Sequence, residues 1–122
     1  MNKRRSFIVG ISSTKLLPSE RSFIKKYKPW GVILFTRNIK SINQTKILTT
    51  SIRKIFNDDK YPILIDQEGG RVNRLKNFIS FDNLTSEFFG KKFINNKKEF
   101  VIYYKLFIDK TSFLLKTMGI NI

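Results

Sequence analysis

The chain has 122 residues, of which 41% are hydrophobic and 14% aromatic, so it suits one globular domain or part of one and is not a disordered chain. It contains no Cys and no His, which excludes disulfides, thiolate chemistry, and the commonest proton shuttle and metal ligand. The formal net charge of +15 comes from basic residues scattered along the whole chain, without the clustering of a nucleic-acid-binding patch.

The first part of the chain alternates short apolar runs with more polar segments. Residues 6–11 form an apolar run that suits a buried strand and is too short for a secretory signal. Pro18 stands where a first helical turn would begin, and Pro29 stops the short helix that this predicts. Residues 30–35 form a second continuous apolar run and predict a second buried strand.

A helix over residues 41–56 has the clearest signals in the sequence. Ser41 and Gln44 form an S-x-x-Q capping box, and apolar residues recur behind it at helical spacing. Residues 61–66 then predict a third strand. The part that follows has an irregular pattern, with one or two helical turns near residues 85–93.

A long helix is predicted over residues 97–118, because an apolar stripe runs along it and Gly119 is a suitable terminator. Charged residues interrupt this segment, so it is not a membrane span, and we predict a cytoplasmic protein. Residues 120–122 begin another apolar run. The series of strands and helices indicates an α/β fold with a parallel sheet, and both an open doubly wound sheet and a closed barrel fit it.

Residues 62–75, PILIDQEGGRVNRL, carry the candidate chemistry. Ligands of parallel α/β folds bind at the carboxyl ends of the strands, and Asp66 is the last residue of the third predicted strand. The pair Gly69–Gly70 lets the backbone turn sharply over a ligand, so that Arg71 and Arg74 come back toward the carboxylates. Carboxylate acceptors beside planar guanidinium donors suit a sugar.

The local pattern leaves three other interpretations of this stretch open. One is an ordinary turn with a surface ion pair between Glu68 and Arg71, which would contribute little. Another treats Asp66 and Glu68 as the carboxylate pair of a retaining glycosidase, although acids two positions apart are common by chance. The third is a divalent metal held by the same two acids, for which the neighbourhood supplies no obvious further oxygen ligands.

Four stretches resemble the N-terminal third of the bacterial glycoside hydrolase family 3 β-N-acetylhexosaminidases. They are GVILFTRNI at 31–39, QTKILTTSIRK at 44–54, LIDQEGGRVNRL at 64–75 and LLKTMGIN at 114–121. The resemblance implies a (β/α)₈ TIM barrel, of which this chain carries the first three βα units and the start of strand 4. It also implies hydrolysis of terminal β-linked N-acetylglucosamine from muropeptides during peptidoglycan recycling in the cytoplasm.

The resemblance further implies roles for single residues. Asp66 and Arg74 would bind the sugar. The residues that would shape the loop between them are Glu68, Gly69, Gly70 and Arg71. In this family an aspartate nucleophile and a histidine acid/base, the latter on a K-H-F-P-G-H-G loop, belong to later strands, so we expect no catalytic residue in this chain. We expect no metal and no cofactor either.

We therefore interpret residues 1–122 as a partial family 3 barrel domain, truncated at its C-terminal end and inactive alone. The expected partner is an N-acetylglucosamine-containing saccharide. The alternative is a non-catalytic sugar-binding or assembly half that needs a separate chain to complete the barrel. We expect no membrane partner, because charged residues interrupt the most apolar segment. We expect no nucleic-acid partner either, because the bias toward Lys, Asn, Ile and Phe, without Ala, is one that an AT-rich genome produces. A basic nucleic-acid-binding protein is the remote alternative.

Overall fold

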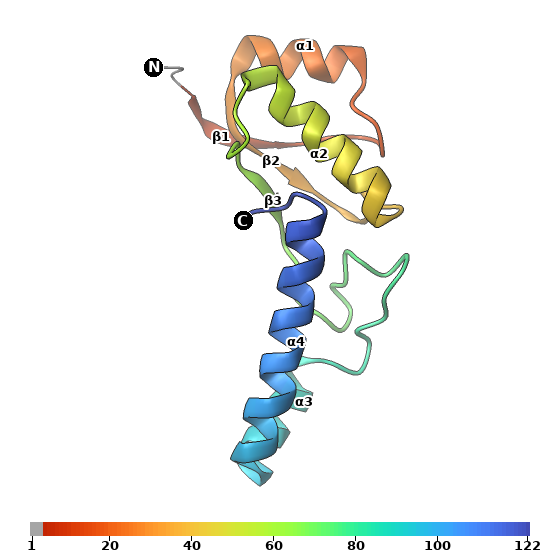
Figure 1. Ribbon diagram of the computed structural model, residues 1–122, viewed down its shortest axis with the longest axis vertical. Coiled ribbons are helices and arrows are strands. Elements are labelled where there is room, and N and C mark those ends of the chain that lie inside the picture. Colours follow the sequence, from red (N-terminus) through yellow and green to blue (C-terminus); the bar gives the residue numbers. More distant parts are fainter. Residues whose placement is uncertain (1–3) are drawn as a thin grey trace.

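The computed structural model describes residues 4–122 and contains a parallel sheet with helices packed against it (Figure 1). The α/β class expected from the sequence is confirmed, and the elements follow one another in the expected order. They are β1 (Arg5–Gly10), α1 (Pro18–Tyr27), β2 (Pro29–Leu34), the 3₁₀ turn η1 (Thr36–Asn38), α2 (Ile42–Phe56), β3 (Ile63–Ile65), α3 (Ser86–Asn95) and α4 (Lys97–Thr117).

The three strands lie side by side in the order β1-β2-β3, with all pairs parallel. Val9 pairs with Val32, and Val32 pairs with Ile63, so these three side chains share one face of the sheet. Val32 and Ile63 are fully buried on that face. On the opposite face Ile8 is largely exposed and Leu64 only partly covered, so the helices pack mainly on one side of the sheet.

The core lies between the covered face of the sheet and the apolar sides of the helices. Ile24 of α1 and Leu48 and Ile52 of α2 are buried there. Helix α2 contributes through a regular face, because its buried residues recur every three or four positions. The other buried residues of this cluster include Ile11 directly after β1, Val32 and Leu34 of β2, Ile63 of β3, and Met118 and Ile120 of the last segment.

The start of α2 differs in one detail from the predicted capping box. Ser41 caps the helix as expected, since its Oγ accepts a hydrogen bond from the Gln44 backbone N–H at 3.2 Å. Gln44, however, accepts from the backbone N–H of Lys40 at 2.8 Å and not from that of Ser41. Its amide nitrogen donates to the carbonyl oxygen of Thr14 at 2.7 Å, so this side chain ties α2 to the loop after β1.

The third strand and the helices after it also differ from the predicted bounds. β3 is shorter than residues 61–66, because Pro62 has no N–H for the ladder. The helical stretch expected near residues 85–93 is a helix over Ser86–Asn95, with Thr85 Oγ1 accepting from the Phe88 N–H at 3.1 Å. It packs against α4, which extends away from the sheet in Figure 1. Within residues 4–122 we find no helix with the length and apolarity that crossing a bilayer requires.

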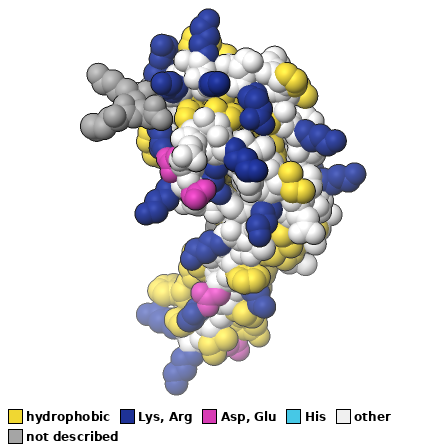
Figure 2. All heavy atoms as spheres, turned by 45° about the horizontal axis from the view of Figure 1, so that its top comes forward, with side chains coloured by type: hydrophobic (Ala, Val, Ile, Leu, Met, Phe, Trp, Pro, Cys, Tyr) yellow, Lys and Arg dark blue, Asp and Glu magenta, His cyan; other side chains and the backbone are white. Residues whose placement is uncertain are grey.

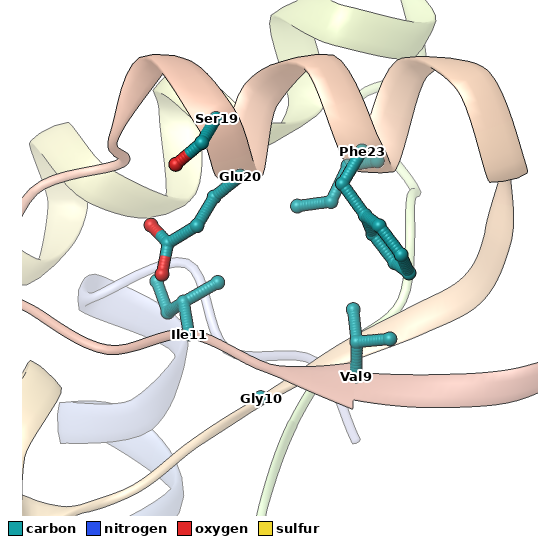
Figure 3. Close-up of a pocket in the computed structure, with 7 residues that line it drawn as sticks. Val9, Gly10, Ile11, Ser19, Glu20 and Phe23 are labelled. Atoms are coloured by element: carbon teal, nitrogen blue, oxygen red, sulfur yellow. The ribbon is translucent and has the colours of Figure 1, made fainter.

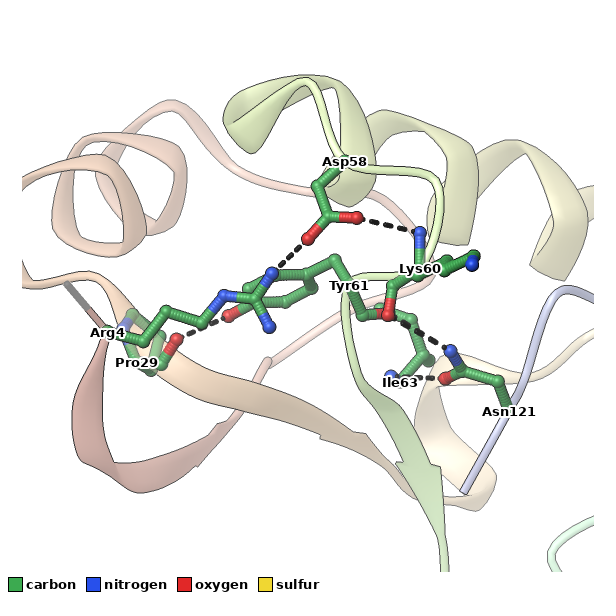
Figure 4. A network of polar contacts seen from close by, with 7 residues as sticks. All are labelled: Arg4, Pro29, Asp58, Lys60, Tyr61, Ile63 and Asn121. Carbon is green, nitrogen blue, oxygen red and sulfur yellow. Dashed lines mark hydrogen bonds and ion pairs between the residues drawn. The ribbon is translucent and has the colours of Figure 1, made fainter. Parts of the chain in front are cut away.

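After α4 the chain turns at Gly119 and runs beside β3. The Ile122 N–H donates to the carbonyl oxygen of Ile63 at 3.2 Å, and the Ile65 N–H donates to the Ile122 carbonyl oxygen at 3.0 Å. Asn121 adds a side-chain bond, because its Oδ1 accepts from the Ile63 N–H at 2.8 Å (Figure 4). These alternating bonds are those of a parallel neighbour, so the order of the sheet continues into residues 120–122.

Tyr61, two residues before the start of β3, is buried at the amino-terminal edge of the sheet (Figure 4). Tyr61 is fully buried, stacks on Phe56 with ring centroids 4.2 Å apart, and donates its hydroxyl to the Pro29 carbonyl oxygen at 2.9 Å. The Arg4 guanidinium lies over the Tyr61 ring and also bonds to Asp58. Burial raises the pKa of Tyr61 to about 12, so the hydroxyl is protonated in the folded protein at neutral pH.

We expect Tyr61→Phe to lower the free energy of unfolding by about 1–2 kcal/mol, because the buried Pro29 carbonyl loses its donor. The difference from wild type should narrow as the pH rises from about 10 toward about 12. In this pH range Tyr61 ionises in the unfolded chain before it ionises in the folded one, which lowers the free energy of unfolding of the wild type. The Phe variant has no hydroxyl at this position, so this effect is absent from it. Urea denaturation at several alkaline pH values measures both effects, with the exposed Tyr103→Phe as the control. A gap that stays constant or widens would contradict this account.

Candidate functional site

The candidate site lies at the carboxyl edge of the sheet, where the strand ends meet. Asp66 directly follows Ile65, the last residue of β3, so the acid occupies the edge that the sequence predicted. Phe35 directly follows β2, and a Cβ added to Gly10 at the end of β1 would lie 3.2 Å from its ring. The Arg74 guanidinium lies 5.4 Å from the centroid of the same ring. Residues that follow two neighbouring strands are thus brought together here.

Asp66 and Arg74 form a bidentate ion pair. Arg74 Nε donates to Asp66 Oδ1 at 2.8 Å, and Arg74 Nη2 donates to Asp66 Oδ2 at 2.6 Å. The hydrogen bonds from Arg74 hold the pKa of Asp66 below its ordinary value, and the same bonds raise the pKa of Arg74. The Asp66 side chain is 41% exposed and that of Arg74 26%. Each carboxylate oxygen therefore keeps lone pairs that a ligand hydroxyl can reach.

The turn between these two residues requires both glycines. Gly69 has φ +98° and Gly70 has φ +55°, values that residues with a side chain rarely adopt. A Cβ at Gly69 would also lie 2.8 Å from the Leu84 carbonyl oxygen. The Gly69 and Val72 backbones exchange hydrogen bonds across the turn, and the Gly70 N–H donates to the Phe81 carbonyl at 3.1 Å. Both glycines therefore have the positive φ values that a sharp turn at this pair requires.

Two amide side chains hold the loop in this shape and were not predicted from the sequence. Gln67 Oε1 accepts from the Arg74 backbone N–H at 2.9 Å, and Gln67 Nε2 donates to Asn73 Oδ1 at 3.2 Å. Asn73 is buried and donates in turn to the Ile79 carbonyl at 2.7 Å. In the sequence, only their position between Asp66 and Arg74 pointed to these two residues. An uncharged amide lacks the charge that made Asp66 a candidate site residue.

The residues after β2 are part of the family resemblance, but none of them was assigned a role from the sequence. The Arg37 guanidinium lies 4.7 Å from the Phe35 ring centroid, and its Nε donates to the Ile11 carbonyl at 3.0 Å. Asn38 is fully buried and joins the loops after β1 and β2. Its Nδ2 donates to the carbonyl oxygens of Ile11 at 3.0 Å and Ser13 at 2.9 Å, while its Oδ1 accepts from the Phe35 N–H at 2.9 Å.

Glu68 and Arg71 do not join the pair. Both are exposed, and among residues 4–122 no ion pair links them, so the interpretation of a Glu68–Arg71 surface bridge is wrong. Glu68 and Gln67 line a cavity of about 470 Å³ together with α3 and α4 aromatic residues, including Phe89 and Tyr104. In the described part of the chain no three His, Cys, Asp or Glu residues gather as metal ligands would.

Comparison with known proteins gives matches to bacterial β-hexosaminidases. No protein-family model matches the chain. A β-hexosaminidase from Hydrogenovibrio crunogenus is 40% identical over 92 residues, which are 75% of this chain and 25% of that enzyme. A β-hexosaminidase from Alkalilimnicola ehrlichii is 39% identical over 71 residues, 57% of this chain and 20% of the enzyme. The chain thus spans a quarter or less of the length of these relatives.

Solved structures of the same kind share the fold over part of this chain. Native NagZ from Neisseria gonorrhoeae is 33% identical, with a TM-score of 0.53 over 58% of this chain and 20% of NagZ. A glycoside hydrolase family 3 β-N-acetylglucosaminidase from Paenibacillus is 28% identical, with a TM-score of 0.54 over 62% of this chain and 15% of that enzyme. By sequence and by fold, the chain is therefore similar over part of its length to bacterial β-hexosaminidases and to a glycoside hydrolase family 3 β-N-acetylglucosaminidase, and these matches support a partial hexosaminidase of that family.

Proposed function

We propose that the loop from Asp66 to Arg74 is a sugar-binding element of a β-N-acetylhexosaminidase-type glycoside hydrolase. The main support for the proposal is the bidentate Asp66–Arg74 ion pair at the carboxyl edge of a parallel sheet, where ligands of such folds bind. The pair offers acceptor and donor atoms side by side, which suits neighbouring ring hydroxyls. A NagZ structure from Neisseria gonorrhoeae, 33% identical to this chain, holds N-trifluoroacetyl-D-glucosamine, which supports an N-acetylglucosamine-containing ligand here.

The sheet supports the further proposal that this chain forms the first part of a (β/α)₈ barrel. Its strands are neighbours in the order of the sequence, and residues 120–122 continue that order beside β3. The helices pack mainly on one face, as the outer helices of a barrel do. In this arrangement Asp66 and Arg74 would lie at the mouth of the barrel, with the complete enzyme acting on muropeptides in the cytoplasm during peptidoglycan recycling.

We further propose that this chain binds without hydrolysing. It contains no His to act as acid/base, and Asp66 is held as an ionised partner of Arg74 by the hydrogen bonds that lower its pKa. The neighbouring acid, Glu68, lines a cavity beside α3 and α4, and we assign it no role as the second carboxylate of a glycosidase pair. Asp66 is thus suited to accepting hydrogen bonds from a saccharide, and no group of this chain is assigned to breaking its glycosidic bond.

Titration of the ¹⁵N-labelled chain with N-acetylglucosamine, followed by NMR, tests the proposal. We expect shifts at the amides of residues 66–75, and Asp66→Asn should weaken binding by about tenfold or more, because the amide loses the charge and the Arg74 pair. Asp82→Asn is the matched control, since Asp82 is an exposed acid in the following loop. A chromogenic N-acetylglucosaminide should not be hydrolysed. Equal affinity of the two variants, no binding by the folded wild type, or turnover would overturn the proposal.

A second candidate role, an assembly half that another chain completes, is favoured by the outer edge of β1, which pairs with no other strand within residues 4–122. An apolar hollow lies between this edge and α1, and Figure 3 shows Val9, Ile11 and Phe23 around it. Phe23 is exposed there, although it is a large aromatic residue. A further strand with its helix would cover both the unpaired backbone groups of β1 and this hollow. The sugar-binding role of the Asp66–Arg74 loop is the same in both candidates.

A further inference from the structure

We propose that the outward face of α4 binds the surface of an anionic lipid membrane. The helix carries two apolar stripes. Phe107, Leu114 and Leu115 pack against the core, as a helix of this fold requires. On the other side Ile102, Leu106 and Phe113 are 65%, 53% and 67% exposed. At about 100° per residue these three fall within about 40° of one another and opposite the buried side of the helix.

Lysines border this outward stripe of Ile102, Leu106 and Phe113. Lys105 and Lys116 fall on one side of it, and Lys110 falls on the other. Asp109 and Glu99 also flank the stripe, and each of these acids is paired with a lysine. Figure 2 shows hydrophobic and basic side chains interspersed over the part of the molecule that extends away from the sheet. An apolar stripe between lysines is the pattern of a helix that lies in the interface of a bilayer, with the lysine stems reaching to the head groups.

Helix α3 extends the same kind of surface. Phe93 is 46% exposed and Ile94 is 81% exposed. Each acid of α3 and α4 is already paired with a lysine, in the pairs Glu87–Lys91, Glu99–Lys92 and Asp109–Lys105. The lysines of these helices outside those pairs are Lys97, Lys98, Lys110 and Lys116. The surface is therefore apolar with an excess of positive charge.

Charge decides which partner fits this surface. A second copy of the chain would bring another net charge of +15 against the first, which opposes self-association through this face. Nucleic acid complements the lysines, but its phosphates would leave Ile102 and Phe113 in water or against charge. Anionic lipid complements both features, since its head groups attract lysines and its acyl region accepts apolar side chains. The sequence-based expectation of no membrane partner considered only a spanning segment, which an interfacial helix does not need.

Co-sedimentation of the full chain with vesicles tests the proposal. We expect the wild type to bind vesicles of phosphatidylcholine mixed with phosphatidylglycerol and to bind pure phosphatidylcholine at least about tenfold more weakly. Ile102→Ser combined with Phe113→Ser should reduce binding to the mixed vesicles by about tenfold or more, because the apolar anchors are lost. The matched control combines Leu17→Ser with Ile47→Ser, which removes exposed apolar residues from another part of the surface and should bind like the wild type.

Circular dichroism checks that both double variants keep the wild-type helix content. We expect this result because all four positions are exposed to solvent. The proposal is overturned if the α4 variant binds mixed vesicles as tightly as the control variant does. It is also overturned if light scattering shows a wild-type dimer that the α4 substitutions dissociate. Tighter binding to duplex DNA than to the mixed vesicles, equally strong in both variants, would assign the basic surface to nucleic acid instead.

Discussion

Replacing Gly119 with Ala is expected to lower the free energy of unfolding by about 3 kcal/mol, because the backbone and the space at this position both exclude a side chain. Gly119 has φ +80°. A Cβ there would lie 2.6 Å from Thr49 Oγ1 and 2.8 Å from Arg53 Nη1. Thr49 cannot move without loss, since its buried hydroxyl donates to the Met118 carbonyl oxygen at 2.8 Å. The substitution therefore strains the turn and the contact between α2 and the end of α4.

Gly90→Ala supplies the control for this measurement. Gly90 lies inside α3, and a Cβ added there meets no atom within 4 Å. Alanine has the higher helix propensity, so this variant should be more stable than the wild type by about 0.5–1 kcal/mol. Urea denaturation of both variants gives the two free energies. If Gly119→Ala were as stable as Gly90→Ala, the turn that places residues 120–122 beside β3 would be misassigned.

Asn38→Asp is expected to destabilise the chain by about 3 kcal/mol at neutral pH. The Asn38 amide donates to the Ile11 and Ser13 carbonyl oxygens from a fully buried position. A carboxylate of the same shape has no hydrogen to donate, so both carbonyls lose their donor and face a negative charge. Only the bond from the Phe35 N–H to the side-chain oxygen remains possible.

The dependence on pH distinguishes this mechanism from a general loss of packing. The destabilisation of Asn38→Asp should shrink in acid, because the protonated carboxyl is uncharged and has one hydrogen to donate. Asn83→Asp is the control, since Asn83 is exposed and its replacement should change the stability by no more than about 0.5 kcal/mol. Denaturation curves recorded at neutral and acid pH provide the comparison. A penalty for Asn38→Asp that does not change with pH would indicate that the buried charge is not its cause.

Local sequence patterns, those set by residues close together in the chain, predicted the fold well. The apolar runs predicted the strands, and Pro18, Ser41 and Gly119 marked ends of helices that the structure shows. Helix α3 was underestimated because its stability depends on tertiary packing. Phe89, its buried residue, packs against Tyr104 and Phe107 of α4, and those contacts do not appear in the local pattern.

The candidate site was predictable to the extent that it depends on charge. Asp66 and Arg74 attract each other from within one short loop, so their pairing followed from the residue types and the glycines between them. Asn38 was not predictable, because its partners Ile11 and Ser13 lie in another loop and are backbone carbonyls, which every residue has. A buried amide shows its role only when the fold shows which backbone groups would otherwise lack a partner.

The order β1-β2-β3 has a consequence for how the chain is made. Each strand pairs with the strand synthesised just before it, and residues 120–122 pair with β3 in the same way. As the chain leaves the ribosome, each new strand can therefore pair with a strand that has already been synthesised. Folding can proceed by successive addition of strand and helix units.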